Sequence, residues 1–295
     1  MTCGPILHAM TTRTGAGRAP RFGVALQPTV DDRGLEPFYT DFLAGVEEEL
    51  DRSGATVLLH VVHGLDDELA AYRRWARDGL VDAVVAGDLV EDDPRAAFCA
   101  DLGLPLVLIG GEPGCGASVV DYDNGGAMRT AVAFLADLGH RRIGRVSGPA
   151  RYAHTRARDA AFGPALAELG AQGVQAEGDY GEASGAAATR TLLQAPEPPT
   201  ALVYDNDVMA VAGLAVAAEL GVDVPGRLSV LAWDDSANCR LSHPPLSVVS
   251  RDVHEVGQDT ARLLLRLAAG AAPEVLTTPG VRVVARGTTG PAPRA

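Results

Sequence analysis

Residues 200–236 read TALVYDNDVMAVAGLAVAAELGVDVPGRLSVLAWDDS, and this order of residues is typical of a strand, a helix and a second strand. The apolar run 201–204 predicts the first strand, and the acceptors of the DND triplet at 205–207 suit the start of a helix. The run 228–232 predicts the next strand, with the WDD triplet at 233–235 just past its end. In open parallel sheets, ligands bind beyond the carboxyl ends of strands. The two polar clusters therefore predict one binding site.

The bulk composition restricts the classes of function. The chain has 295 residues, of which 47% are hydrophobic and 21% charged, as in ordinary soluble proteins. All 25 basic residues are arginine, so functions that need a lysine, such as Schiff-base formation or a P-loop, are excluded. The net charge of −13 opposes binding to nucleic-acid phosphates by this chain alone.

The sequence has no pattern typical of a metal site, a cofactor, a membrane segment or a catalytic set. The four cysteines are far apart and lack the spacing of zinc ligands. The string GEPGCGAS at 111–118 approaches the phosphate-binding pattern but has Ala117 in place of its lysine. The first residues lack a secretion signal, and no apolar run reaches the ~18 residues of a membrane span. We therefore expect a cytoplasmic binding protein and not an enzyme.

Strands and helices alternate along the rest of the chain. Apolar runs predict further strands at 22–26, 56–62, 83–86, 105–109, 118–120, 142–147, 174–176, 246–250, 275–276 and 281–285. Helical periodicity predicts helices at 38–50, 66–78, 94–102, 156–169, 182–193 and 253–267, and one ending near 139. Such alternation implies parallel sheets. Because the pattern starts again at Gly148 and Pro149, it indicates an α/β protein with two doubly wound lobes.

Several strings, taken in order, resemble the ligand-binding region of the lactose/galactose-repressor (LacI/GalR) family of bacterial transcription regulators. They are EPFYTDFLAGVEEEL, DYDNGGA, FLADLGHRRIGRVSGP, EGDYGEASG, TALVYDNDVMAVAGLAVAAELG, VPGRLSVLAWDDS, HPPLSVVSRDVHEVG and VVARGTT, and they cover roughly residues 21–290. The resemblance implies a periplasmic-binding-protein-like fold of type I, with two lobes joined by crossover strands. It also implies an effector site in the cleft and a homodimer.

The resemblance suggests a division of the chain. Residues 1–20 lack periodicity and are expected to form a flexible linker remnant, and 291–295 a tail. Two lobes are expected, an N-terminal one of 21–148 plus 249–274 and a C-terminal one of 149–248 plus 275–290. Family regulators begin with a helix-turn-helix head, for which residues 1–20 are too few. This chain is therefore expected to sense a ligand, with operator DNA as a partner only where such a head is present.

The resemblance also suggests site residues. Sugars offer an apolar ring face and a rim of hydroxyls, so their sites combine aromatic rings with carboxylates, amides and arginine. The candidate positions are Phe38, Tyr39, Asp123, Tyr152, His154, Arg158, Tyr180, Asn206, Trp233 and Asp234. Plainer roles compete for three of them, namely core packing for Phe38, a surface ion pair for Arg158 and helix capping for Asn206. Asp205 stands where the family commonly has a small residue, and this extra carboxylate favours a ligand rich in hydroxyls or carrying an amine.

The sequence therefore predicts the effector-sensing and dimerisation region of a LacI/GalR-type regulator that binds a sugar or polyol between its lobes. The response would be closure of the lobes around the ligand. The alternative is a stand-alone solute-binding protein with no DNA-binding role. An in-frame helix-turn-helix upstream would favour the regulator, and a true start at Met1 or Met10 would favour the stand-alone sensor.

Overall fold

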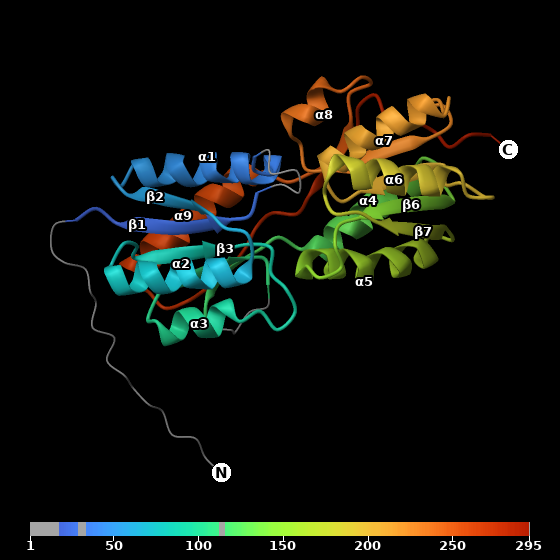
Figure 1. Cartoon of the computed structure of the whole chain (residues 1–295). Helices are drawn as coiled ribbons and strands as arrows, with labels where there is room; N and C mark the ends of the chain where they lie inside the picture. The colour runs from blue at the N-terminus through green and yellow to red at the C-terminus, as the bar shows by residue number, and fades with distance from the viewer. Residues whose placement is uncertain (1–17, 29–33, 112–115, 295) are drawn as a thin grey trace, which may run out of the picture.

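A computed structural model describes residues 18–28, 34–111 and 116–294 of the chain (Figure 1). Most of the expected linker, part of the glycine-rich string at 111–118 and the last residue of the tail lie outside the described residues. The described residues form two lobes, each built on a six-stranded sheet with helices on both faces. The predicted fold class is confirmed.

The first lobe holds a fully parallel sheet in the order β11-β5-β4-β3-β1-β2. Its strands are β1 (Arg21–Leu26), β2 (Thr56–Val61), β3 (Ala83–Ala86), β4 (Leu106–Ile109), β5 (Ser118–Asp121) and β11 (Val275–Thr277). Its helices are α1 (Pro37–Asp51), α2 (Leu65–Asp78), α3 (Arg95–Asp101) and α9 (Val253–Ala268). Because side chains alternate along a strand, Val24 packs with α1 and α9, whereas Ala25 packs with α2 on the other face.

The second lobe repeats this plan in the order β12-β10-β9-β8-β6-β7, with β12 as its antiparallel member. Its strands are β6 (Arg142–Ser147), β7 (Gln172–Glu177), β8 (Ala201–Tyr204), β9 (Ser229–Trp233), β10 (Ser247–Ser250) and β12 (Arg282–Val284). Its helices are α4 (Asn124–Asp137), α5 (Ala153–Glu168), α6 (Glu182–Leu193), α7 (Asp207–Glu219) and α8 (Ala237–Leu241). Helices α4 and α5 cover one face, and α6 and α7 cover the other.

The lobe boundaries differ from those expected from the sequence. Strand β6 belongs to the second sheet, and α4 packs its buried Met128 and Leu135 into the core of that lobe. Strand β11, expected in the C-terminal lobe, instead completes the first sheet beside β5. The chain thus crosses between lobes near 122–123, 251–252 and 278–281. Each crossover is only a few residues long, so periodicity alone did not reveal it.

None of the helices in the described residues is long and apolar enough to cross a membrane. The same residues contain no cluster of three or more histidine, cysteine or acidic side chains placed to hold a metal ion.

Candidate ligand-binding site between the lobes

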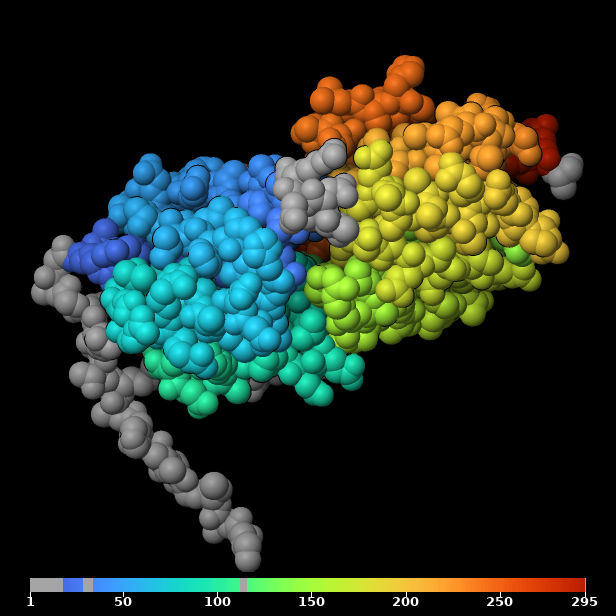
Figure 2. Space-filling model, in the orientation of Figure 1, coloured from blue at the N-terminus to red at the C-terminus, as the bar shows by residue number. Residues whose placement is uncertain are grey.

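Residues that closely follow strands of both sheets line the space between the lobes. They are Asp88 after β3, Tyr122 after β5, Asp205 after β8, Asp234 after β9 and Arg251 after β10. This is the position at which open parallel sheets place their ligands. Figure 2 shows the two lobes meeting along a narrow seam between the blue and cyan surface and the yellow and green surface.

Two adjoining cavities lie in this space, and we call them the outer and the inner chamber. The outer chamber has a volume of about 450 Å³ and extends along the starts of α1 and α9. The inner chamber has a volume of about 50 Å³ and lies beside Tyr180 and Arg158. Both are lined by Glu36, Phe38, Asp234 and Arg251. Four shared lining residues make the chambers two parts of one cleft.

Three lining residues have left-handed backbone conformations. The φ angles are 48° at Asp88, 72° at Tyr180 and 61° at Asp234. Such conformations cost a non-glycine residue on the order of 1–3 kcal/mol and cluster at ligand-binding sites. Their position around the chambers supports this cleft as the functional part of the molecule.

The first lobe contributes an aromatic wall from the start of α1. The Phe38 ring lines both chambers and meets the Tyr39 ring edge-on, with 5.2 Å between centroids. The Tyr39 side chain is buried, and its hydroxyl donates to Asp88 Oδ2 at 2.8 Å. Phe38 also stacks on Phe42 of the core. Phe38 therefore combines core packing, the role that competed for it, with a place in the cleft wall.

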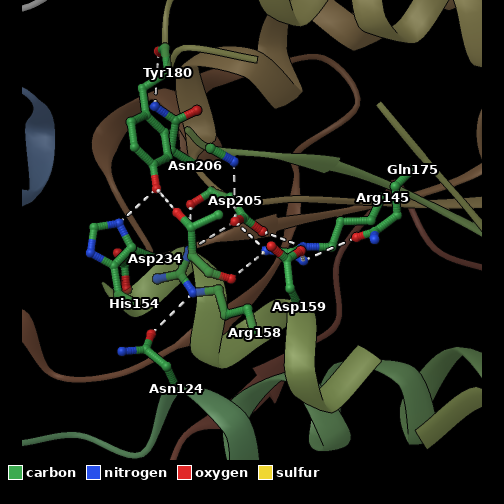
Figure 3. Close-up of polar contacts among 12 residues, drawn as sticks. Asn124, Arg145, His154, Arg158, Asp159, Gln175, Tyr180, Asp205, Asn206 and Asp234 are labelled. Carbon is green, nitrogen blue, oxygen red and sulfur yellow. Dashed lines mark hydrogen bonds and ion pairs between the residues drawn. The ribbon is translucent and has the colours of Figure 1, made fainter. Parts of the chain in front are cut away.

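Arg158 is buried in the second lobe and is not a surface residue. Its Nε donates to Asn124 Oδ1 at 3.0 Å, and a terminal nitrogen donates to the Asp205 carbonyl at 3.1 Å (Figure 3). The guanidinium lies 4.1 Å from the centre of the Trp233 ring, a geometry that favours a cation–π contact. The expected competing role in a surface ion pair is excluded because Arg158 is only 5% exposed.

Asp205, expected as an extra carboxylate for the ligand, is instead paired with arginines. Arg145, fully buried in β6, donates to its two oxygens at 2.8 and 2.6 Å (Figure 3). Arg158 lies 3.5 Å from the same carboxylate. Burial raises the pKa of Asp205, but Arg158 and Arg145 outweigh burial and hold that pKa below its ordinary value. Asp205 therefore positions the arginines, and the inference drawn from it about the ligand is withdrawn.

Three rings from the second lobe form an aromatic cluster. The Tyr180 hydroxyl bonds His154 Nε2 at 2.7 Å and Thr155 Oγ1 at 3.1 Å (Figure 3). Tyr152 stacks on His154 with 5.4 Å between centroids, and only Tyr180 and His154 of these rings line a chamber. Burial and the nearby Arg158 lower the pKa of His154 to about 3. This imidazole is therefore neutral at ordinary pH.

Asn206 joins the two lobes. Its side-chain oxygen accepts from Met209 N at 3.0 Å and so caps α7, while its amide nitrogen donates to Glu36 Oε1 of the first lobe at 3.0 Å. The same nitrogen donates to the Tyr180 carbonyl. Asn206 thus fulfils the capping role that competed for it and also bridges the cleft.

Arg251 and Asp234 meet where the two chambers join. Arg251 Nε donates to Asp234 Oδ1 at 3.1 Å, and the guanidinium lies 4.4 Å from the centre of the Tyr122 ring. Arg251 is only 8% exposed, although it sits in a crossover segment between the lobes.

Asp123 lies outside the cleft. It is exposed, lines neither chamber and accepts from Gly126 N at 2.7 Å as the N-cap of α4. A carboxylate next to a helix start satisfies backbone N–H groups there, and this local role accounts for its position.

The lining residues that sequence reasoning missed include Glu36, Asp88, Tyr122 and Arg251. Three of them follow strands at the same sheet edge as the residues that were chosen. The rule applied to β8 and β9 would have found them if applied to β3, β5 and β10 as well. Glu36 precedes α1 and has no such signal.

The raised pKa of Glu36 leads to a prediction about pH. Burial, followed by the repulsion of Asp88, raises the pKa of Glu36 to about 8 from 4.5. The folded state therefore holds this proton more tightly than the unfolded state, and the contribution of Glu36 to stability declines as pH rises between those values. Below pH 6.5 the unfolded chain protonates His154, and this protonation makes stability rise with pH, opposite to the effect of Glu36. The effect of Glu36 is therefore measured best between pH 6.5 and pH 8.

In that window we expect the melting temperature of Glu36→Gln to fall less with rising pH than that of the unaltered chain. Exposed Glu182 provides a matched control, because Glu182→Gln should leave the slope unchanged. Parallel slopes for all three proteins would contradict the assignment.

Residues 132–289, more than half of the chain, match the periplasmic binding protein-like domain. An uncharacterized HTH-type transcriptional regulator from Streptomyces limosus is 36% identical over 78% of this chain and 68% of that protein. A solved LacI family transcriptional regulator from Bifidobacterium animalis is 34% identical, with a TM-score of 0.85 over 92% of this chain and 98% of that chain. The chain belongs to the LacI/GalR family of transcriptional regulators.

The predicted family is thereby confirmed. A further LacI/GalR-like structure, that of the transcriptional regulator CelR in complex with cellobiose, is 28% identical to this chain. Its TM-score is 0.83 over 92% of this chain and 85% of that chain.

Proposed function

We propose that this chain is the effector-sensing region of a regulator of transcription and that its effector is a sugar held between the lobes. The observation that carries the proposal is the mixed lining of the cleft, which brings aromatic rings, arginines and carboxylates together from both lobes. Sugars need ring faces to pack on and dense donors and acceptors around them. The cellobiose complex of CelR supports the same ligand class.

The charge of the outer chamber favours an uncharged sugar. Its acidic lining residues are Asp41, Asp207, Asp234, Asp235, Asp252 and Glu255, against Arg251, Arg282 and His254, and Glu36 adds no charge below its pKa of about 8. An excess of carboxylates repels phosphorylated sugars and nucleotides, whereas neutral hydroxyls donate readily to carboxylate oxygens. A neutral polyol or saccharide fits this lining best.

Sensing follows from hydrogen bonds that join the two lobes. Asn206 donates to Glu36 as described, and Ala153 N donates to the Leu89 carbonyl at 2.7 Å. A ligand that touches both lobes stabilises the arrangement in which these bonds are made and shifts the population by its differential affinity. Operator binding belongs in this proposal to a helix-turn-helix head acting in the cytoplasm, because the acidic chain opposes phosphate contacts.

A melting-temperature screen tests the ligand class. A ligand present at about 100 times its Kd adds roughly 2.7 kcal/mol of stability. We expect neutral saccharides to raise the melting temperature, and glucose 6-phosphate, adenosine and amino acids to leave it unchanged. A rise with adenosine or an amino acid and none with any saccharide would overturn the sugar assignment.

We further propose that the chain forms a homodimer through exposed apolar residues on both lobes. Leu59 and Val61 of β2, an edge strand, are 42% and 49% exposed, and Leu241 of α8 is 83% exposed. In Figure 1, α8 lies at the top of the second lobe and β2 lies beneath α1 in the first lobe. Exposed edge strands and large apolar side chains are typical of surfaces that meet a partner.

Sedimentation should therefore give twice the chain mass of 30.5 kDa. The double substitution Leu59→Glu with Leu241→Glu should give the mass of one chain, because it would bury charge in the interface. Leu220→Glu, on an exposed leucine of the second lobe, serves as the control. A monomeric unaltered chain would contradict the dimer.

A further inference from the structure

Arg251 has donors that the described residues do not use. Its Nε is bonded to Asp234, but neither terminal nitrogen has a hydrogen-bond partner in the part of the chain that the structure describes. The residue is 8% exposed, so solvent reaches it poorly. Buried polar groups are almost always hydrogen-bonded in native proteins, and an orphaned charged donor needs an explanation.

The surroundings of Arg251 fix the plane of its guanidinium. The Tyr122 ring lies 4.4 Å from the guanidinium carbon and the Trp233 ring 5.9 Å from it. Asp234 holds the Nε edge, so the other edge, which carries the two terminal nitrogens, is already oriented. A planar arginine presents two parallel N–H groups to neighbouring oxygens at no further cost of ordering.

Arg251 occupies a defined position in the cleft. It lines both chambers, so it lies where the chambers join. The inner chamber, at about 50 Å³, is far smaller than the outer one and suits a substituent better than a sugar ring. The outer chamber, at about 450 Å³, lies within the roughly 300–1,000 Å³ range of sites that enclose drug-sized ligands.

We propose that Arg251 binds the effector at this junction and that the effector is an oligosaccharide of at least two sugar rings. The inference rests on the proposed sugar-sensing function and goes beyond it. One ring places neighbouring hydroxyl oxygens on the two terminal nitrogens of Arg251 and extends a single substituent into the inner chamber. The next ring lies in the outer chamber, where its hydroxyls donate to the acidic lining.

Calorimetric titration distinguishes the proposed site for two or more sugar rings from a site that binds a single ring. The probes are glucose and its disaccharides cellobiose, maltose and trehalose, titrated into the unaltered chain. We expect the best disaccharide to bind at least tenfold more tightly than glucose. Glucose binding as tightly as the best disaccharide would overturn the oligosaccharide assignment and leave the sugar-sensing function standing. Failure of every saccharide would overturn the proposed function, and this inference with it.

Two substitutions test the role of Arg251 with the best disaccharide. Arg251→Met should weaken its binding at least tenfold, and Arg251→Lys should restore little of it, because one ammonium group cannot offer two coplanar donors. Arg266→Met removes an exposed arginine of α9 that pairs with Glu274, and it should leave affinity unchanged. Unchanged affinity in Arg251→Met would overturn the assignment.

The melting temperature without ligand distinguishes ligand binding from a structural role. Arg251→Met leaves Asp234 without its partner, but Asp234 is partly exposed, so the melting temperature without ligand should fall only slightly, whereas loss of a fully buried ion pair would lower it strongly. A large fall in melting temperature, with the affinity of Arg251→Lys equal to that of the unaltered chain, would identify Arg251 as a structural residue and overturn the proposal.

Discussion

Asp205→Ala should lower the free energy of unfolding by about 3–5 kcal/mol, the usual cost of removing one partner from a buried ion pair. Arg145 has no exposed surface and gives Asp205 two hydrogen bonds, and Arg158 lies beside the same carboxylate. Without Asp205, two buried guanidinium groups lose their shared counter-ion, although Arg145 keeps Asp159 and Gln175. Urea denaturation of the purified protein measures the effect.

Two further variants distinguish the cost of losing this buried ion pair from the general cost of shortening a side chain. Replacing the pair together, as Arg145→Met with Asp205→Leu, should recover part of the lost stability, because Arg145 is no longer buried without Asp205, although Arg158 still loses its counter-ion. Glu197→Ala removes the exposed partner of Arg142 and should change stability by no more than about 1 kcal/mol. Equal losses for Asp205→Ala and Glu197→Ala would contradict the network drawn in Figure 3.

Asp234→Ala should weaken effector binding by about 2–4 kcal/mol, or roughly 30- to 900-fold in Kd. Asp234 lines both chambers and holds Arg251 through Nε, so its loss removes an acceptor for the ligand and releases the arginine from its orientation. A loss of similar size is expected for Arg158→Ala. Calorimetric titration with the best saccharide of the screen measures both effects.

Asp123 supplies a matched control for Asp234. Both are aspartates placed shortly after a strand, but Asp123 caps α4 and lines neither chamber. Asp123→Ala should therefore cost about 0.5–2 kcal/mol of stability and leave the Kd unchanged. A Kd that shifts with Asp123→Ala and stays constant with Asp234→Ala would place the ligand away from the chambers.

The fold could be predicted from the sequence because its signals are local. Short apolar runs, separated by segments of helical periodicity, predicted nearly all strands and helices to within a few residues. The division into lobes is not local, since β11 joins β5 across more than half of the chain. Pairing between such distant strands does not change the periodicity of either segment.

The site residues also fall into two groups, those with a local signal in the sequence and those that depend on a distant partner. Asn206 and Asp234 could be found because each follows a strand of the βαβ unit with which the sequence argument began. The role of Asp205 could not, because its partner Arg145 lies sixty positions earlier and only the paired strands β6 and β8 bring the two together. An isolated carboxylate in a sequence suggests a ligand contact, whereas a buried arginine beside it shows a structural pair.

Hydrogen exchange with and without the best saccharide tests the central claim most directly, because it locates the ligand on the chain. A ligand held between the lobes should slow exchange in both lobes at once, around 36–42 in the first lobe and around 152–158, 204–209 and 233–236 in the second. Slower exchange confined to one lobe, or placed away from these segments, would contradict an effector site in the cleft.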